Sequence, residues 1–336
     1  MPDRTILITG ACGEIGQALI ETLSEDPQTT IISLDLKTLP EYLKGKSTHY
    51  QADLLDTEFL RKIEKKYTFQ DIYHLAAVLS TTAEHNPAFA HRVNTCITLD
   101  LLDLAARQSK ELGFSVKFLF PSSIAVYGMP DLETKSSAPP VKENQWTDPI
   151  TMYGCSKLYS EKVGTYYSDH YHQLSNQIPT RIDFRALRFP GIISAITVPS
   201  GGTSDFGPEM IHYAAQGKPY TCFVRPDVRI PFMVMPDAVR SLIELSLAPL
   251  DKLTRRVYNV TSFSYSAGDF QRFTESGFPG AQISYQPDLA RQSIVDSWPA
   301  DIDDQAARLD WGWKPDFNAE DACQNYLLKN IRDHYS

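Results

Sequence analysis

The sequence predicts an α/β fold, in which a doubly wound parallel sheet is followed by a smaller, loop-rich C-terminal domain. In the first half, short runs rich in β-branched residues alternate with longer helical patterns, and this alternation is typical of βαβ units. After about Arg188 the rhythm changes, because Pro, Gly and Ser interrupt residues 190–208. We therefore expect a nucleotide-binding domain over residues 1–188, to which the chain returns later, and a mainly substrate-binding domain over residues 189–336.

Each element of the first half follows from its own residue pattern. Strands are expected where Ile, Leu, Val and Phe gather in short runs, and helices where apolar residues recur every three or four positions. Parallel sheets bind ligands beyond the carboxyl ends of their strands, so we look for functional side chains there. The expected elements are strands at 5–9, 30–34, 72–75 and 116–120, helices at 14–23, 87–112 and 151–171, and a surface loop at Ser136–Pro140.

The composition is that of an ordinary globular protein and excludes several functional classes. Among 336 residues, 32 Lys and Arg stand against 41 Asp and Glu, a formal net charge of −9, whereas nucleic-acid binders usually carry a basic surplus. The sequence lacks the run of about 18 apolar residues that predicts a membrane span, and its first residues show no signal-peptide pattern. The 5 cysteines are scattered, which argues against disulfides and a metal site. We expect a cytoplasmic protein without nucleic-acid or membrane partners.

A glycine-rich loop between the first strand and the first helix predicts a dinucleotide site. Gly10 permits the tight turn, Gly13 lets the backbone approach a pyrophosphate, and Gly16 allows the helix to pack closely on the strand. The helix that begins at Glu14 and Ile15 directs its free N–H groups at the same anion. Glycine triplets alone are a weak signal, and it is the position between strand and helix that makes this one specific.

Two acidic residues extend the predicted site toward the adenosine. Asp35 ends the second strand, where a carboxylate accepts hydrogen bonds from a ribose and repels a 2′-phosphate. NAD is therefore favoured over NADP, although Lys37 is a nearby cation that would tolerate the phosphate. Asp53, followed by Leu54, comes after another short strand and is a candidate for the adenine amine. The alternative for Asp35 is a solvated acid at a strand end.

A Tyr-x-x-x-Lys pair and an upstream serine form the catalytic hypothesis. On a helix, Tyr153 and Lys157 share a face, because residues four apart are neighbours. The lysine ammonium and a nearby nicotinamide charge favour the phenolate and lower the pKa of Tyr153 toward the working pH. Ser123 ends a predicted strand and can hydrogen-bond the substrate oxygen close to Tyr153. We therefore predict that Tyr153 is the general base.

With these motifs the sequence resembles the extended short-chain dehydrogenase/reductase family over nearly the whole chain. The residues that carry the resemblance are Tyr153, Lys157, Ser123 within Ser-Ile-Ala-Val-Tyr-Gly128, Asn94, and Leu75, Ala76 and Ala77. It implies a modified Rossmann domain that carries NAD and a small C-terminal domain that closes over the substrate. It also implies that Asn94, Leu187, Pro190 and the segment from Leu75 to Ala77 shape the cofactor site, and that Tyr153 and Lys157 contact the cofactor as well. Without the resemblance, Asn94 would equally be a polar residue on a helix face.

The C-terminal half resembles one branch of that family, whose members oxidise L-threonine with NAD. The segments that carry this resemblance are Leu187–Ser194, Gly201–Phe206, Gly217–Phe223, Arg229–Asp237, Asp296–Pro299 and Asp310–Lys314. The resemblance implies hydride transfer from the β-carbon of threonine to NAD, which gives 2-amino-3-oxobutanoate. Two positions of the substrate loop depart from the pattern, since Ser200 replaces a usual Gly and Ser204 replaces a usual Thr.

Small polar side chains in this half suit a small polar substrate. Asp205 is either the partner of a substrate ammonium or the N-cap of the next helix. Trp298 either walls the pocket or belongs to the core, and His74, beside an apolar run, is expected to be a core residue. The predicted substrate residues are Ser80, Ser123, Tyr153, Thr203, Ser204, Asp205 and Trp298.

The segment Pro199–Phe206 is expected to form a lid over the substrate. Gly201 and Gly202 give its backbone the freedom to hinge. A substrate as small as threonine needs a loop that both excludes water and orients the reacting carbon. Thr203 is the best candidate for a direct contact with the substrate carboxylate.

Two other functions stay open. A nucleotide-sugar 4-epimerase or dehydratase with bound NAD would place Arg229 against a diphosphate. Against this function, Phe189-Pro190-Gly191 replaces the Asn-containing stretch of such epimerases, and Ile124-Ala125 lacks the acidic pair of a dehydratase. The third candidate is a non-catalytic NAD sensor, but such relatives often lose the Tyr or the Lys that this chain keeps.

We also expect a homodimer. The helical patterns at 87–112 and 151–171 carry apolar residues on more than one face, and the resemblance implies that these helices pair with their symmetry mates in a four-helix bundle. The apolar residues concerned are Val93, Ile97, Leu101 and Leu104 on the first helix and Leu158, Val163, Tyr166 and Tyr167 on the second.

Overall fold

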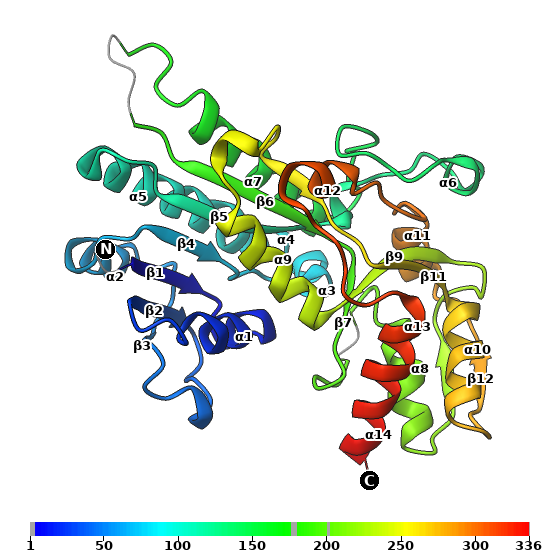
Figure 1. Cartoon of the computed structure of the whole chain (residues 1–336). Coiled ribbons are helices and arrows are strands. Elements are labelled where there is room, and N and C mark those ends of the chain that lie inside the picture. The colour runs from blue at the N-terminus through cyan, green and yellow to red at the C-terminus, as the bar shows by residue number, and fades with distance from the viewer. Residues whose placement is uncertain (1–3, 176–179, 200–201, 336) are drawn as a thin grey trace. The chain divides into compact units, whose positions relative to one another are not determined.

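The predicted α/β architecture is confirmed, with a seven-stranded sheet as its central element (Figure 1). The structure is a computed structural model that describes residues 4–175, 180–199 and 202–335. The pairings from β3 through β2, β1 and β4 to β5 are parallel. The strands lie in the order β10 (Val257–Asn259), β6 (Asp183–Phe189), β5 (Lys117–Ser123), β4 (Asp71–His74), β1 (Arg4–Thr9), β2 (Thr29–Asp35) and β3 (Thr48–Gln51).

Helices connect these strands, and α1 begins just beyond the carboxyl end of β1 (Figure 1). The long helix predicted at 87–112 is confirmed, with one π-helical turn at Arg92–Cys96 between α4 and α5. Such turns are rare and often occur at functional sites. The helices are α1 (Glu14–Leu23), α2 (Thr57–Lys66), α3 (Ser80–His85), α4 (Pro87–His91), α5 (Ile97–Leu112), α7 (Met152–Asp169) and α9 (Met235–Leu247).

The chain divides into two compact units, each made of separate stretches of sequence. The first comprises Met1–Ser122, Cys155–Leu187 and Leu242–Val257, and the second comprises Ser123–Gly154, Arg188–Ser241 and Tyr258–Ser336. The division into domains at residue 188 stays a prediction.

The core of the first unit consists of the apolar residues of the strands and the inner face of α5. Leu7, Ile72 and Phe118 come from three neighbouring strands and are fully buried, and Leu101 of α5 packs in the same cluster. Burying one such side chain stabilises the fold by about 1.5–3 kcal/mol. This core holds the carboxyl ends of the strands in fixed positions.

The second unit contains two small sheets and several short helices. Phe232 is the centre of its core, with the ring of Phe270 at 4.9 Å and that of Phe206 at 5.8 Å between centroids. Its strands are β7 (Gly191–Ile193), β9 (Arg229–Val234) and β11 (Phe263–Ser266) in one sheet and β8 (Tyr220–Cys222) and β12 (Ile283–Tyr285) in the other. Its helices are α6 (Leu132–Ser137), α8 (Phe206–Ala215), α10 (Ala267–Gly277), α11 (Leu289–Asp296), α12 (Gln305–Trp311), α13 (Ala319–Asp321) and α14 (Lys329–Tyr335), with a π-helical segment at Ala322–Leu328.

The loop predicted at Ser136–Pro140 is partly wrong, because its first two residues end helix α6. Asp131 caps this helix and accepts a hydrogen bond from the backbone N–H of Thr134 at 2.7 Å. Lys135 is buried and donates to the carbonyl of Val295 at 2.8 Å. The cap formed by Asp131 and the buried hydrogen bond of Lys135 thus stabilise the helix despite the weak helix propensity of the two serines.

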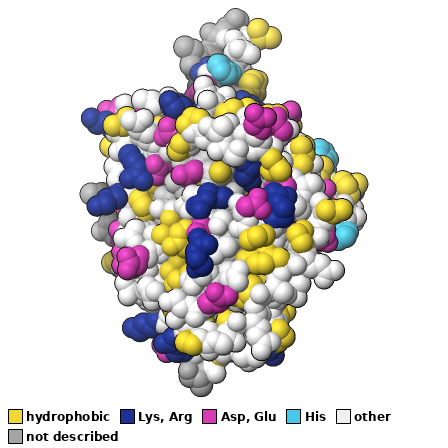
Figure 2. Space-filling view, turned by 90° about the vertical axis from the view of Figure 1, so that its right-hand side faces the viewer, with side chains coloured by type: hydrophobic (Ala, Val, Ile, Leu, Met, Phe, Trp, Pro, Cys, Tyr) yellow, Lys and Arg dark blue, Asp and Glu magenta, His cyan; other side chains and the backbone are white. Residues whose placement is uncertain are grey.

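The surface carries charges of both signs. On the face that Figure 2 shows, basic and acidic side chains alternate with hydrophobic ones rather than forming a patch of one sign. Within the described residues, no helix is long and apolar enough to cross a membrane, and no group of three or more His, Cys, Asp or Glu side chains is placed to hold a metal.

Candidate functional site

The glycine loop lies where the sequence predicted it, between β1 and α1. Gly10 has a φ of +67°, and a β-carbon there would lie 2.7 Å from the backbone nitrogen of Ala76. The backbone N–H of Leu75 in turn donates to the carbonyl of Thr9 at 3.2 Å. The structure therefore brings Leu75 and Ala76 against the loop and leaves no room for a side chain at Gly10. Gly13 is the N-cap of α1, which begins with Glu14, Ile15 and Gly16, and a helix N-terminus at this position favours an anion.

Asp35 ends β2 as predicted, and its carboxylate faces the glycine loop. One oxygen accepts a hydrogen bond from the backbone N–H of Cys12, and the other accepts one from the backbone N–H of Lys37, both at 2.9 Å. Each oxygen can accept a second bond, so the group can bind ribose hydroxyls. Asp53 follows β3 and is exposed, although its carboxylate accepts from the N–H of Leu55 at 2.9 Å. Leu54 beside it is buried.

Replacing Asp35 with Asn should reduce the preference for NAD over NADP. The amide keeps the shape and an acceptor oxygen, but it removes the charge that repels a 2′-phosphate. We expect kcat/KM for NAD to fall several-fold, and the ratio of the two kcat/KM values to move by about tenfold toward NADP. Steady-state kinetics with both cofactors measure this ratio, and Asp53→Asn is the matched control at a neighbouring strand end. An unchanged ratio would show that the charge of Asp35 does not set the preference.

Asn94 lies in the π-helical turn and is buried. Its side-chain oxygen accepts from the N–H of Val78 at 2.7 Å, and its side-chain nitrogen donates to the carbonyl of the same residue at 2.9 Å. The two bonds fix the loop that follows β4, which includes Ala77. This contact is consistent with the cofactor-side role that the sequence implied, although Asn94 acts on the backbone of a neighbouring loop.

Ser123 and the Tyr–Lys pair occupy the positions that the sequence predicted, at the end of β5 and in the first turns of α7. Ser123 accepts a hydrogen bond from the N–H of Ala125 at 3.1 Å, and its own hydroxyl hydrogen remains able to donate. Tyr153 is the second residue of α7, and Lys157 follows one turn later. In this structure the pKa of the Tyr153 phenol is not lowered, as the sequence predicted, but raised to about 12, because the phenol is buried.

Lys157 is buried under the end of β5. Its ammonium donates to the carbonyl of Pro121 at 2.6 Å and lies 4.5 Å from the centre of the Phe120 ring. Burial lowers the pKa of Lys157 to about 8, and the negative charge of Glu161 acts in the opposite direction. The ammonium is therefore held against the backbone of β5 at Pro121.

Gly154, next to Tyr153 in α7, is a sterically constrained position that the sequence patterns did not reveal. A β-carbon at this position would lie 2.0 Å from the carbonyl oxygen of Ala125, so α7 approaches the turn after Ser123 as closely as two backbones can. This contact sets the distance between the serine turn and the start of the helix that carries Tyr153. A glycine inside a helix lowers its stability by about 1 kcal/mol relative to alanine. A glycine within the predicted helix was therefore the one sign in the sequence of a close contact at this position.

The described part of the predicted lid is held by two contacts that the sequence did not reveal. The carboxylate of Asp205 accepts from the N–H of Gly202 at 2.6 Å, and the guanidinium of Arg291 donates to the carbonyl of Gly202 at 2.7 Å. Asp205 occupies the N-cap position of α8, one of the two alternatives for it, but its carboxylate makes no capping hydrogen bond to that helix. Its carboxylate is instead bonded to the loop. Ser200 and Gly201 lie outside the described residues.

The other predicted residues are divided between the two units. Thr203 and Trp298 are buried, Ser204 is partly buried, and all three belong to the second unit. Ser80 is the first residue of α3, in the first unit. Leu187 near the end of β6 and Pro190 just after it are both buried.

His74 is confirmed as a core residue. Its Nδ1 lies 2.8 Å from the hydroxyl of Thr9, and its Nε2 lies 3.0 Å from that of Thr98. Burial lowers the pKa of His74 to about 3, so the imidazole is neutral at ordinary pH. Both ring nitrogens are occupied, and His74 is not a general base.

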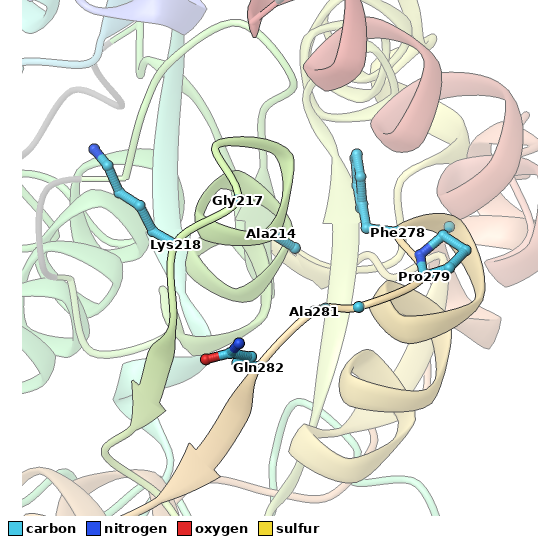
Figure 3. Close-up of a pocket in the computed structure, with 9 residues that line it drawn as sticks. Ala214, Gly217, Lys218, Phe278, Pro279, Ala281 and Gln282 are labelled. Atoms are coloured by element: carbon cyan, nitrogen blue, oxygen red, sulfur yellow. The ribbon is translucent and has the colours of Figure 1, made fainter.

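A cavity of about 250 Å³ lies in the second unit, beyond the ends of α8 and α10. Figure 3 shows that glycine, alanine and proline residues form most of its wall, and that the Lys218 side chain points away from it. It contains none of the predicted site residues. With few polar groups converging on it, this cavity does not fit a binding site for a small polar substrate.

The residues of the first unit fit a bound dinucleotide, since the close approach at Gly10 leaves a bare backbone at the N-terminus of α1 and Asp35 faces the same loop. The model of the NAD dependent epimerase/dehydratase family matches residues 6–261. L-threonine 3-dehydrogenase, mitochondrial, from Bos taurus is 33% identical over 325 residues, which cover 96% of this chain and 82% of the relative.

Two of the solved structures that resemble nearly the whole chain are threonine dehydrogenases. The first is a monomeric L-threonine 3-dehydrogenase from a metagenome, in its apo form, with 35% identity, a TM-score of 0.83, and coverage of 98% of this chain and 100% of that one. The second is the holo form of a GalE-like L-threonine dehydrogenase from Cupriavidus necator, with 34% identity, a TM-score of 0.83, and coverage of 99% and 100%. The chain therefore belongs to the NAD-dependent epimerase/dehydratase family, and it is an NAD-dependent oxidoreductase.

Proposed function

We propose that this chain oxidises L-threonine at its β-hydroxyl with NAD and produces 2-amino-3-oxobutanoate. The observation that carries the proposal is similarity to threonine dehydrogenases along the full chain, including the part beyond residue 261 that the family model does not reach. The segment after residue 261 belongs to the second unit, which also contains the predicted substrate residues Thr203 and Trp298. Similarity in the segment after residue 261 therefore supports the proposed substrate rather than the cofactor.

In the proposed mechanism, Tyr153 removes a proton while the β-carbon loses a hydride. NAD, when bound, supplies the hydride acceptor and a positive nicotinamide ring that favours the phenolate. The Tyr153 phenolate takes the hydroxyl proton, and the electrons of that O–H bond form the carbonyl as the Cβ–H bond breaks. Ser123 donates a hydrogen bond to the same oxygen. The Lys157 ammonium stabilises the phenolate from the next turn of α7.

The activity is tested by following NADH formation with L-threonine and NAD, in parallel with turnover of UDP-galactose. We expect NADH to form with threonine and the sugar nucleotide to remain unchanged. Arg229, which an epimerase would use for a diphosphate, already donates to the carbonyl of Ser264 at 2.6 Å and to Asp269 at 2.5 Å. Turnover of the sugar nucleotide without oxidation of threonine would replace the proposal with the epimerase function.

Thr203→Ala should raise the KM for threonine about tenfold or more and leave the KM for NAD nearly unchanged. A hydroxyl that bonds a charged carboxylate contributes about 1.5–3 kcal/mol, which corresponds to this range. Thr203 lies next to Gly202, the residue that Asp205 and Arg291 hold, so its position in the loop is fixed. Thr221→Ala, an exposed threonine of β8, is the matched control. Equal KM values for threonine in the two variants would remove Thr203 from the substrate site.

We also propose a homodimer, although the structure changes which side chains could form it. Ile97, Leu101 and Leu104 of α5 are buried in the core of their own chain, so they are not an exposed interface. Tyr166 of α7 is exposed and remains a candidate, and Tyr159, which the sequence did not single out, is exposed on the same helix. Sedimentation at micromolar concentration should give twice the mass of the chain, and Tyr166→Asp should shift it to the monomer. A wild-type monomer, as named for one relative, would refute the dimer.

A further inference from the structure

Helix α7 carries a buried carboxylate that the mechanism above does not use. Glu161 lies one turn beyond Lys157, and only 1% of its surface is exposed. It accepts a hydrogen bond from the hydroxyl of Ser122 at 2.5 Å. A buried charge is costly unless partners compensate it, so its position calls for a specific role.

The contacts of Glu161 lead to both groups that assist Tyr153. Ser122, its hydrogen-bond donor, immediately precedes Ser123 in β5. Lys157, one turn earlier on the same helix, donates to the carbonyl of Pro121 in the same strand. Two successive turns of α7 are thus bonded to two successive residues of β5, and Ser123 is the next residue along that strand.

We infer that Glu161 is a positioning residue for the reaction, which fixes the end of β5 through Ser122 and holds Lys157 in its ammonium form through its charge. The inference rests on the proposed function insofar as it concerns the oxidation of threonine. The charge and the hydrogen bond are separable contributions, because one acts on Lys157 and the other on the strand that carries Ser123.

The titratable groups near Lys157 make Glu161 the source of the compensating charge. Burial alone would drive Lys157 toward the neutral amine, and Glu161 acts against this by raising the pKa of Lys157. His74 is neutral because burial lowers its pKa to about 3. Burial raises the pKa of Tyr153, one turn earlier, so its phenol is protonated and contributes no negative charge beside Lys157. Removal of the Glu161 charge should therefore let Lys157 deprotonate at lower pH.

Two substitutions separate the contributions. Glu161→Gln keeps an oxygen that accepts from Ser122 and removes the charge, so the alkaline limb of the kcat profile should move to lower pH. Ser122→Ala keeps the charge and removes the bond, so kcat should fall about tenfold to hundredfold through misplacement of Ser123, while the alkaline limb and the KM for NAD stay in place. Lys162→Gln, an exposed neighbour on the same helix, is the control and should match wild type in both.

A second measurement keeps the inference independent of the substrate. Nuclear magnetic resonance of isotope-labelled lysine side chains, with Lys157→Met used for assignment, follows the titration of Lys157 directly. The pKa of Lys157 should fall in Glu161→Gln and stay unchanged in Ser122→Ala and Lys162→Gln. If wild type does not oxidise threonine, the proposed function fails and this titration still decides the charge effect.

The inference is overturned if Glu161→Gln leaves both the pH profile and the Lys157 titration as in wild type. It is equally overturned if Ser122→Ala keeps full kcat. Should Glu161→Gln fail to fold, the Ser122→Ala result alone decides whether the bond to β5 positions Ser123.

Discussion

Replacing Tyr153 with Phe is expected to lower kcat by about 10²- to 10⁴-fold, the range that general acid–base catalysis contributes. The substitution removes one hydroxyl and keeps the ring, so the packing of the first turn of α7 is preserved. Binding of NAD should stay close to that of wild type, because the cofactor loop belongs to β1 and α1. Turnover of threonine and titration with NADH measure the two quantities separately.

The control is Tyr159→Phe, an exposed tyrosine on the same helix. It makes the same chemical change two turns further on and should keep full activity. If Tyr153→Phe turns over threonine at the wild-type rate, the general base is another group, and the proposed mechanism fails even though the family assignment stands.

Gly10→Ala is expected to weaken NAD binding by at least about a hundredfold, the cost of roughly an ångström of misplacement. The added β-carbon would lie 2.7 Å from the backbone nitrogen of Ala76, and a backbone cannot rotate away as a side chain can. The loop must therefore move, and with it the N–H groups that face the pyrophosphate. Fluorescence titration with NADH measures the dissociation constant directly.

Gly45→Ala separates this steric effect from backbone strain. Gly45 also has a positive φ, +82°, but a β-carbon there would meet nothing within 4 Å. Both substitutions should lower the free energy of unfolding by about 1–2 kcal/mol through the unfavourable φ. Only Gly10→Ala should change NADH binding, and equal affinities in the two variants would show that the approach of Ala76 does not matter.

The sequence predicted features that local patterns encode. Asp35 at the end of a strand, Ser123 at the end of another, and the glycine loop between strand and helix each depend on neighbours along the chain. Strand and helix propensities determine where such elements end, and the direction of a parallel sheet brings those ends to one edge. These positions could therefore be read without a structure.

What the sequence could not show are contacts between residues far apart in the chain. Arg291 bonds to the carbonyl of Gly202, and Gly154 packs against Ala125, without any periodic signal. For Asp205 a capping carboxylate was one of two alternatives, because Asp is a favoured residue at the start of a helix. The nearby N–H of Gly202 binds its carboxylate instead. Similarly, Ile97 and Leu101 suggested an exposed apolar face, since residues that fill a chain's own core show the same helical spacing.

The division of the chain limits how its specificity could be re-engineered. The boundaries between the two units fall after residues 122, 154, 187, 241 and 257, and the first two of these cut β5 beside Ser123 and α7 beside Tyr153. Neither unit is a continuous segment that could be expressed or transplanted by itself. A chimaera that takes one complete unit from a relative with a different substrate would need crossovers at these five points. A single junction would instead leave each unit made partly of this chain and partly of the relative. Such proteins are thus expected to acquire new substrates through changes in their loops rather than through exchange of whole modules.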